Sequence, residues 1–319
     1  MRQTWLLLLF LVLSSCSGAR AQRLVWWNVE NLFDCRHDTL KDDKGFLPDG
    51  EYRWTRSRYW RKLDDLSRTI AAIAGDDAWP MIVGLCEVEN DSVLHDLTRR
   101  SPLRRARYAF VHEESPDERG IDVAMLYDSL QFRLLGHEAR RIPSEENGFR
   151  PTRDLLHVWG KRTPQGDTLH IIMAHLPSRA RNGRKGEMHR RLAIATLCRL
   201  LDELRGCDVL LMGDFNAEPR DRIFRDVEQR LTSLMPQSRK ELKEEKGSYY
   251  FRKTWSYIDH ILVSPSLLNR IDGSVATGSL PFLLTKEGTP KRTFKGPAYN
   301  GGVSDHLPIW VNLHEDNTP

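Results

Sequence analysis

Short apolar runs, rich in β-branched and aromatic residues, recur along nearly the whole chain and are separated by polar segments with turn residues. Such residues favour β-strands, because their stiff side chains pack well on a pleated surface. We expect strands at residues 24–33, 80–88, 107–112, 121–127, 132–136, 155–160, 169–174, 207–212, 257–264 and 307–313. Strands outnumber helices and short turns join many of them, which favours mixed sheets over strict alternation of strand and helix. The pattern predicts an α/β fold in which two sheets pack face to face with helices outside.

Two longer segments have the period of an amphipathic helix. In residues 55–75 the apolar positions recur every three or four residues, and Gly75 is a plausible C-cap. Residues 187–205 show the same spacing. The apolar positions that carry the two patterns are Trp60, Leu63, Leu66, Ile70 and Ile73, then Ile194, Leu197, Leu201 and Leu204. We expect these helices to cover the outer faces of the sheets.

The first residues resemble an export signal. Arg2 precedes an apolar run at residues 5–13, and Ala19-Arg20-Ala21 fits a small-x-small cleavage site. This predicts a signal peptide at residues 1–21 and a single domain at residues 22–319. The run is far shorter than the roughly 20 residues that span a bilayer, so no integral membrane span is expected. We expect an exported protein in the periplasm or outside the cell. Residues 13–16 also fit a lipoprotein box, in which Cys16 would carry a lipid anchor.

Composition limits the class of protein. The chain is 40% hydrophobic and 9% aromatic, which argues against a disordered chain. Its formal net charge is only +4, so no strongly basic tail is present. Residues 177–186 nevertheless carry a local cluster of positive charge that consists of Arg179, Arg181, Arg184 and Lys185. This cluster could attract an anionic substrate, although a solvated surface explains it as well.

Polar groups stand at the ends of several apolar runs, where a sheet edge would bring them together. A single such residue is usually a turn or cap residue, but six clusters of Asn, Asp, Glu and His are hard to explain in that way. They are Asn28 with Glu30, Glu87 with Glu89, His175, Asp214 with Asn216, Asp259, and Asp305 with His306. Oxygen ligands without paired cysteines suit Mg²⁺ or Mn²⁺, and His with Asp suits proton handling.

These residues resemble the motifs of one family. Trp27-Asn28-Val29-Glu30-Asn31, Glu87, His175, Gly213-Asp214-Phe215-Asn216, Tyr257-Ile258-Asp259-His260 and Ser304-Asp305-His306 occur in the order of the endonuclease/exonuclease/phosphatase superfamily. The similarity runs from about residue 23 to 313. It implies a four-layer α/β sandwich, flanked by helices, and metal-dependent cleavage of a phosphate ester.

The resemblance also implies a set of metal ligands. Glu87 would be the principal Mg²⁺ ligand, with Mn²⁺ as an alternative ion. Asn28 and Glu30 would lie beside it and orient or bind the metal. Asp305 would supply a second carboxylate.

The remaining motif residues would carry the chemistry. By the same resemblance, Asp214 would orient or deprotonate the attacking water and Asn216 would hold the water or the phosphate. His306 would contact the scissile phosphate and be oriented by Asp259. His175 would stabilise the charge that develops on the phosphate oxygens.

Some nearby residues have blander interpretations. Glu89 is expected to be a surface carboxylate, and His260 a structural residue that points to the other face of its strand. Arg119, Gly120 and Asp122 lead into residues 123–127 and are expected to form a turn, although they could shape the rim of the site. Arg153 could reach the phosphate.

The motifs alone do not separate the substrate classes of this superfamily, which includes repair endonucleases, secreted nucleases, inositol-phosphate phosphatases and sphingomyelinases. His175 stands where repair members tend to carry Asn, and the export signal also argues against repair. The basic segment at 177–186 favours a nuclease that hydrolyses nucleic-acid phosphodiester bonds. Two alternatives stay open: an enzyme for phospholipid head groups or small phosphate esters, and a non-catalytic binding protein with the same fold. Nothing in the sequence indicates an obligate protein partner.

Overall fold

A computed structural model describes residues 21–75, 78–178, 183–236 and 247–314. Residues 1–20 of the predicted signal peptide, including Cys16, lie outside this part of the chain, as do Arg179 and Arg181. Among the described residues, no helix is both long and apolar enough to span a bilayer.

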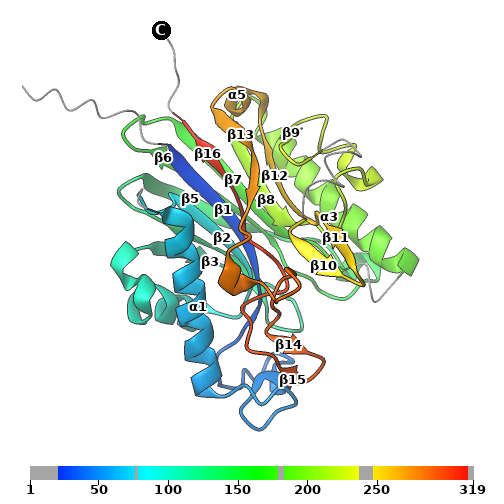
Figure 1. Ribbon diagram of the computed structural model, residues 1–319. Coiled ribbons are helices and arrows are strands. Elements are labelled where there is room, and N and C mark those ends of the chain that lie inside the picture. The colour runs from blue at the N-terminus through cyan, green and yellow to red at the C-terminus, as the bar shows by residue number, and fades with distance from the viewer. Residues whose placement is uncertain (1–20, 76–77, 179–182, 237–246, 315–319) are drawn as a thin grey trace, which may run out of the picture.

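Two six-stranded mixed sheets form the centre of the described part of the chain (Figure 1). The first sheet has the order β13 (Ile271–Thr277), β16 (Ile309–Leu313), β1 (Gln22–Leu32), β2 (Ile82–Val88), β4 (Asp122–Tyr127) and β3 (Ala109–His112). The second has the order β5 (Phe132–Arg140), β6 (Leu155–Arg162), β7 (Thr168–His175), β8 (Asp208–Asp214), β12 (Asp259–Val263) and β9 (Thr232–Ser233). The pairs β1–β2 and β7–β8 are parallel, and the other neighbouring strands in these two sheets are antiparallel.

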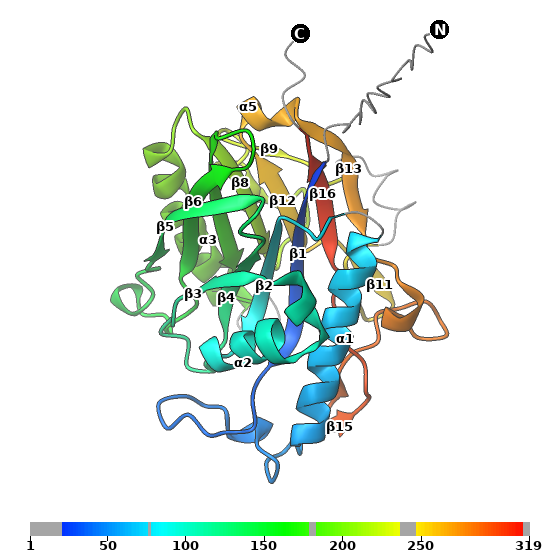
Figure 2. The same cartoon turned by 90° about the vertical axis from the view of Figure 1, so that its left-hand side faces the viewer.

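Three apolar clusters fill the spaces between four layers. The middle cluster joins the two sheets and includes Trp26, Met173 and Ile261. A second cluster lies between the first sheet and α1 (Arg56–Ala74), and a third between the second sheet and α3 (Gly183–Glu203). Figure 1 and Figure 2 show the two long helices on opposite sides of the paired sheets. The predicted fold class is confirmed.

The first helix forms where its sequence predicts. Thr55 caps it by accepting a hydrogen bond from the Arg58 N–H, and Gly75 ends it with a φ of 63°. The smaller elements are α2 (Asp91–His95), α5 (Pro265–Leu268), β10 (Tyr249–Phe251), β11 (Thr254–Ser256), β14 (Phe294–Lys295) and β15 (Ala298–Tyr299). Short helical turns occupy Lys44–Phe46, Asp96–Arg100, Pro102–Ala106, Glu145–Asn147, Arg222–Phe224 and Pro281–Leu283.

All the expected strands are present, with shifted ends. β5 extends to Arg140, well beyond the expected end at residue 136, and β16 begins only at Ile309 because Pro308 has no N–H to donate. Strand β13 was not expected. Its sequence, Ile-Asp-Gly-Ser-Val-Ala-Thr, lies at an edge of the sheet with most side chains only partly covered, so no apolar run marks it.

The two sheets approach closely at Gly84 in β2. A Cβ atom there would lie 2.9 Å from Cε3 of Trp26 and 3.1 Å from Cε of Met173. We expect Gly84→Ala to lower the free energy of unfolding by about 1–3 kcal/mol, because the added methyl overfills a packed core. Urea denaturation would measure this. In a Gly84→Ala, Met173→Ala double variant the loss should be smaller than the sum of the two single losses, and strict additivity would contradict this account.

Candidate active site

Asn28 links the ends of the two sheets. Its side chain is only 2% exposed. The amide Nδ2 donates to Oδ2 of Asp214 across 3.0 Å and to Oε1 of Glu87 across 3.5 Å. The amide Oδ1 accepts from the backbone N–H of Glu30 across 2.9 Å. One residue of β1 therefore positions a carboxylate from each sheet.

The backbone around Glu87 leaves the ordinary strand conformation. Glu30, Asn31 and Glu87 have φ values of 50°, 59° and 63°, in the left-handed region that non-glycine residues rarely adopt. The β1–β2 and β2–β4 registers both shift at these positions. The Asn31 N–H donates to Oε2 of Glu87 across 2.9 Å. The irregularity turns Glu87 toward the site while Cys86 stays in the apolar core, and such local strain is typical of functional sites.

Glu30 and Asp305 share one arginine. Arg292 Nη2 lies 2.8 Å from Oδ2 of Asp305, and its Nε lies 3.7 Å from Oε1 of Glu30. The other oxygen of Glu30 accepts from the Thr293 N–H across 2.7 Å. Burial, and then the charge of Asp305, raise the pKa of Glu30 to about 7. Both carboxylates are thus buried close together with one neighbouring guanidinium.

A buried lysine lies beneath these carboxylates, and the sequence analysis missed it. Lys62 of α1 is 2% exposed, and its Nζ donates to the backbone oxygen of Glu30 and to Oγ1 of Thr293. Burial lowers the pKa of Lys62 to about 8, against the opposing effect of Glu30 and other carboxylates. One signal was available: residue 62 follows Tyr59 by three residues and precedes Leu66 by four, so it falls on the buried face of the helix.

His306 is held by a buried carboxylate. Its Nδ1 lies 2.7 Å from Oδ2 of Asp259. Asp259 also accepts from Nε1 of Trp26 across 3.0 Å and from Oγ of Ser248 across 2.6 Å. Burial alone would lower the pKa of His306, but the neighbouring carboxylates, with Asp259 first, raise it to about 10. His306 is therefore an imidazolium at neutral pH, with Nδ1 engaged and Nε2 facing the site.

Asp214 lies between two imidazoles. Its Oδ2 is 3.8 Å from Nε2 of His306 and 3.7 Å from Nε2 of His175. Its Oδ1 accepts from the N–H of Asn216 across 2.9 Å, and Nδ2 of Asn216 donates to the Leu176 oxygen across 3.0 Å. Burial raises the pKa of Asp214 to about 7. A carboxyl group with such a pKa suits proton transfer near neutrality.

His175 is buried and uncharged. Burial, and then the charge of Arg153, lower its pKa well below the usual value. Its Nδ1 has no hydrogen-bond partner among the described residues. An unpaired acceptor is easier to bury than an unpaired N–H, so we assign the single proton to Nε2, the nitrogen that faces Asp214.

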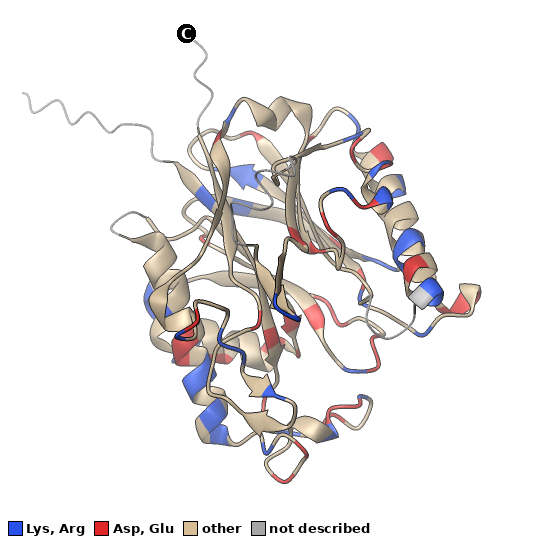
Figure 3. Cartoon of the chain, turned by 45° about the vertical axis from the view of Figure 1, so that its right-hand side comes forward, with Lys and Arg blue, Asp and Glu red and all other residues tan. Residues whose placement is uncertain are grey.

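The structure thus brings together every residue that the motifs singled out. They are Asn28, Glu30, Glu87, His175, Asp214, Asn216, Asp259, Asp305 and His306. They come from the ends of β1, β2, β7, β8 and β12 and from the loop before β16. Figure 3 shows several acidic positions close together among these strand ends.

The expectations for two residues next to the site, Glu89 and His260, differ in how they agree with the structure. The expectation that Glu89 is a surface carboxylate is wrong: it is 5% exposed, and its Oε2 accepts from the Asp34 N–H across 2.6 Å. The β2–β4 irregularity next to it turns it inward, and burial raises its pKa to about 8. The structural interpretation of His260 is confirmed, because its Nε2 bonds to the Ala217 oxygen and its ring packs on Phe215 and Phe224.

The turn before β4 also forms as expected, with Gly120 at a φ of 69°. From this turn Arg119 reaches the rim of the site, where its Nη2 donates to Oδ1 of Asn31 across 2.7 Å. Arg153 is buried instead, with contacts of 3.0 Å to Asp117 and 3.1 Å to the Leu176 oxygen. It supports the backbone that follows His175, and its guanidinium is not free to approach a phosphate.

The donor set fits a hard divalent cation. Glu87, Asp305 and Glu30 offer carboxylate oxygens, which Mg²⁺ and Mn²⁺ prefer. Burial raises the pKa of Asp305, and Glu87 adds to this effect, so the two carboxylates are close enough to repel each other. Cys86 lies near His175 and Asp214, but its thiol belongs to the apolar core and burial raises its pKa well above the usual value. It would remain protonated, which disfavours a soft metal site.

Comparison with known proteins gives one family and a set of similar folds. A model of the Endonuclease/Exonuclease/phosphatase family matches residues 23–315. No curated protein matches the sequence. Solved structures include D. rerio TDP2 complexed with a single-strand DNA product, which has 16% identity, a TM-score of 0.57, and covers 92% of this chain and 99% of that one.

Two further structures are similar to the same degree. The human nocturnin catalytic domain with a bound sulfate anion has 18% identity and a TM-score of 0.55, and covers 92% of this chain and 93% of that one. A Bacteroides thetaiotaomicron mannosyl-6-phosphatase has 17% identity and a TM-score of 0.56, and covers 92% of this chain and 100% of that one. At these identities the likeness concerns the fold alone.

Proposed function

The chain belongs to the endonuclease/exonuclease/phosphatase family, whose members hydrolyse phosphate esters, and from this premise we propose that it is an exported, Mg²⁺-dependent phosphodiesterase that cleaves nucleic acid. The observation that carries the proposal is the position of Asp214. This buried carboxylate accepts from Asn28 and has two imidazole nitrogens within 4 Å, one charged and one neutral. Such an arrangement can take a proton from water beside groups that bind an anion.

Different residues of the site would bind the metal and transfer the proton in phosphodiester hydrolysis. Glu87 and Asp305, with Asn28 and Glu30 beside them, would hold the metal. A bound Mg²⁺ would neutralise the phosphate oxygens and the leaving group. Asp214 would accept the proton of the attacking water. Hydrogen bonds from the Asn28 side chain and the Asn216 N–H orient the Asp214 carboxylate for this role.

The two histidines would bind the phosphoryl oxygens differently. His306 donates from Nε2 as a cation, because Asp259 holds its Nδ1 and keeps its pKa high. His175 donates from Nε2 as a neutral group. A charged and a neutral donor, both held by buried partners, would gain strength as negative charge develops on the oxygens.

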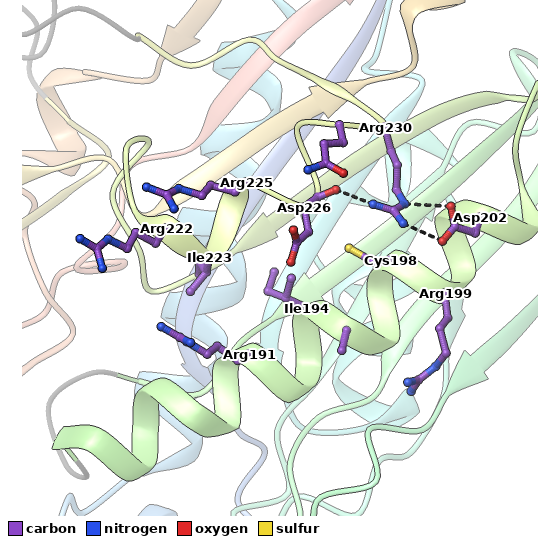
Figure 4. A pocket seen from close by; sticks show the side chains of 12 residues that line it. Arg191, Ile194, Cys198, Arg199, Asp202, Arg222, Ile223, Arg225, Asp226 and Arg230 are labelled. Carbon is purple, nitrogen blue, oxygen red and sulfur yellow. Dashed lines mark hydrogen bonds and ion pairs between the residues drawn. The ribbon is translucent and has the colours of Figure 1, made fainter.

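Positive charge on the second-sheet side supports a polyanionic substrate. A groove of about 740 Å³ lies between α3 and residues 222–230 (Figure 4). Its charged lining consists of Arg191, Arg199, Arg222, Arg225 and Arg230 against Asp202 and Asp226. Helix α3 begins shortly after His175, so its first turns, with exposed Arg184 and Lys185, lie at the same end of the sheet as the site. Such a surface would attract a phosphate backbone.

Nuclease activity is tested with purified protein that lacks residues 1–21. We expect it to cleave plasmid DNA, single-stranded DNA or RNA in Mg²⁺, to lose activity in chelator, and to regain it when Mg²⁺ or Mn²⁺ is returned. Gel electrophoresis and fluorescent oligonucleotides would measure cleavage. Absence of cleavage with either ion would reject the proposal.

A phosphatase is the second candidate, since the mannosyl-6-phosphatase fold is as similar as the nucleic-acid enzymes. The same preparation would be assayed for phosphate release from sugar phosphates and phospholipid head groups. Rapid release from these esters without cleavage of nucleic acid would favour this alternative. Binding without turnover of any ester would instead indicate a non-catalytic protein with the same fold.

A further inference from the structure

A small hairpin stands beside the candidate active site, apart from the two main sheets. Strands β10 and β11 form a two-stranded sheet, in which Tyr249 pairs with Ser256 and Phe251 with Thr254 (Figure 1). An isolated bridge joins Tyr249 to His306, and the Leu307 N–H donates to the Ser248 oxygen across 2.7 Å. The hairpin is therefore fixed to the segment that carries the charged histidine.

The turn of this hairpin has an unusual sequence. The pairing leaves two residues, Arg252 and Lys253, in the turn, and their φ values are 48° and 65°. A two-residue turn with both φ values positive favours Asn-Gly, because long side chains are strained in this region. Two adjacent cations therefore occupy a turn that disfavours them locally. Residue types that are unfavourable for their backbone conformation are expected mainly at positions where the side chain has a function.

Aromatic rings form a row from the histidine to the turn. The Tyr249 ring lies 4.7 Å from the His306 ring, and Phe251 stacks with Tyr249 at 6.2 Å and 20°. The Arg252 guanidinium lies 5.2 Å from the Phe251 ring. Phe251 is 44% exposed and is the one aromatic side chain among the well-exposed large hydrophobics of the described residues.

We propose that this hairpin binds a nucleobase next to the bond that is cleaved, so that the substrate of the site is single-stranded nucleic acid. The base would stack on the exposed ring of Phe251, next to the half-buried ring of Tyr249, while Arg252 and Lys253 contact neighbouring phosphates. Stacking on an aromatic ring needs a base with a free face, which a duplex does not offer, and it tolerates any sequence. The inference rests on the proposed function and names its substrate class.

A membrane surface is the competing partner for an aromatic and cationic hairpin. The structure favours nucleic acid for two reasons. Tyr249 is packed against His306 and not free to insert into lipid, and Phe251 alone offers little apolar surface for insertion. The row of rings also leads toward the residues that would hold the phosphate.

Two variants test the base contact and the phosphate contacts. Phe251→Ala removes the exposed ring. The double change Arg252→Asn with Lys253→Gly removes both cations and installs the turn sequence that the backbone favours. Arg107→Asn is the matched control, because Arg107 is also an exposed arginine with a positive φ, of 55°. It precedes β3, at the end of the first sheet that lies away from the candidate active site.

The substrates are a single-stranded oligonucleotide, the same strand with abasic positions, and its duplex. Wild type should prefer the base-bearing strand over the abasic strand in kcat/KM by about tenfold, and Phe251→Ala should lose this preference. The double variant should unfold at a higher temperature and show a raised KM for the oligonucleotide. Its binding of the oligonucleotide should depend less steeply on salt, so that the slope of log affinity against log salt concentration is smaller by about one to two. Arg107→Asn should retain the wild-type preference and salt slope.

The outcomes separate the inference from the function on which it rests. If wild type cleaves no nucleic acid, the proposed function fails. If wild type cleaves oligonucleotides and both hairpin variants keep its base preference and salt slope, the function survives and the hairpin proposal is overturned. Loss of binding to phosphatidylserine vesicles in Phe251→Ala, with unchanged oligonucleotide cleavage, would likewise overturn it in favour of a membrane contact.

Discussion

Replacing Asp214 by Asn is expected to lower kcat for phosphodiester cleavage by about 10³-fold, because an amide cannot accept the proton of the attacking water. The substitution keeps the size of the side chain and one acceptor oxygen, which can serve either the Asn28 side chain or the Asn216 N–H. The melting temperature should change little, because the lost hydrogen bond opposes the gain from no longer burying a charge. A large loss of activity with little loss of stability cannot come from loss of folding.

Single-turnover kinetics with a saturating oligonucleotide would measure this effect apart from binding. Asp208→Asn is the matched control, because Asp208 begins the same strand at its opposite end and pairs with Arg270. That variant should lose some stability and retain wild-type kcat. If Asp214→Asn cleaved within tenfold of the wild-type rate, another group would have to take the proton.

Most of the site was predictable because its motif residues lie next to the ends of apolar strands. Asp214 and Asn216 end β8, Asn28 and Glu30 lie near the end of β1, and strand ends meet where parallel pairs run side by side. The sequence positions of these residues did not reveal how the backbone would bend at the strand ends. The left-handed φ at Glu87 turns this carboxylate into the site and accompanies the burial of Glu89, which the usual exposure of a carboxylate at a strand end had placed at the surface.

Other members come from segments with no strand signal. Arg292 and Ser248 lie outside the main sheets, and their contacts with Asp305 and Asp259 depend on how distant segments pack. Lys62 differs, because its place on the apolar face of α1 was visible in the helical period. A lysine at such a position must find buried partners, and the fold supplies the Glu30 backbone oxygen and the Thr293 hydroxyl, with the carboxylates of the site as nearby negative charges.

Among the helices and strands, too, some elements were predictable from the sequence and others were not. The long helix α1 and the strands with continuous apolar runs were predictable because burial demands apolar side chains. The edge strand β13 and the hairpin β10–β11 were not, since neighbours or turn geometry hold them and few of their side chains are buried. The hairpin lies beside His306, so the segment with the weakest local signal borders the chemistry.

Replacing Asp259 by Asn is expected to lower kcat by about 10²- to 10³-fold through its effect on His306. The carboxylate serves three donors: Nδ1 of His306, Nε1 of Trp26 and Oγ of Ser248. An amide carries no charge and only one acceptor oxygen, so it cannot hold the imidazolium. Burial would then lower the pKa of His306 from about 10, against the remaining charges of Asp305 and Asp214. The site would keep its cationic donor to the phosphate over a narrower range of pH.

The pH profile distinguishes this role from a merely structural one. A raised histidine pKa means that the charged form persists as pH rises, so wild-type activity should fall only as the pH approaches about 10. In Asp259→Asn the fall should occur at lower pH, and acidification should restore part of the activity as His306 regains its proton. Ser248→Ala is the matched control, because it removes one hydrogen bond and keeps the carboxylate, and it should change kcat by less than about tenfold. If Asp259→Asn kept the wild-type pH profile, His306 would not act as a cation held by Asp259, and its charge would have to be assigned to another contact.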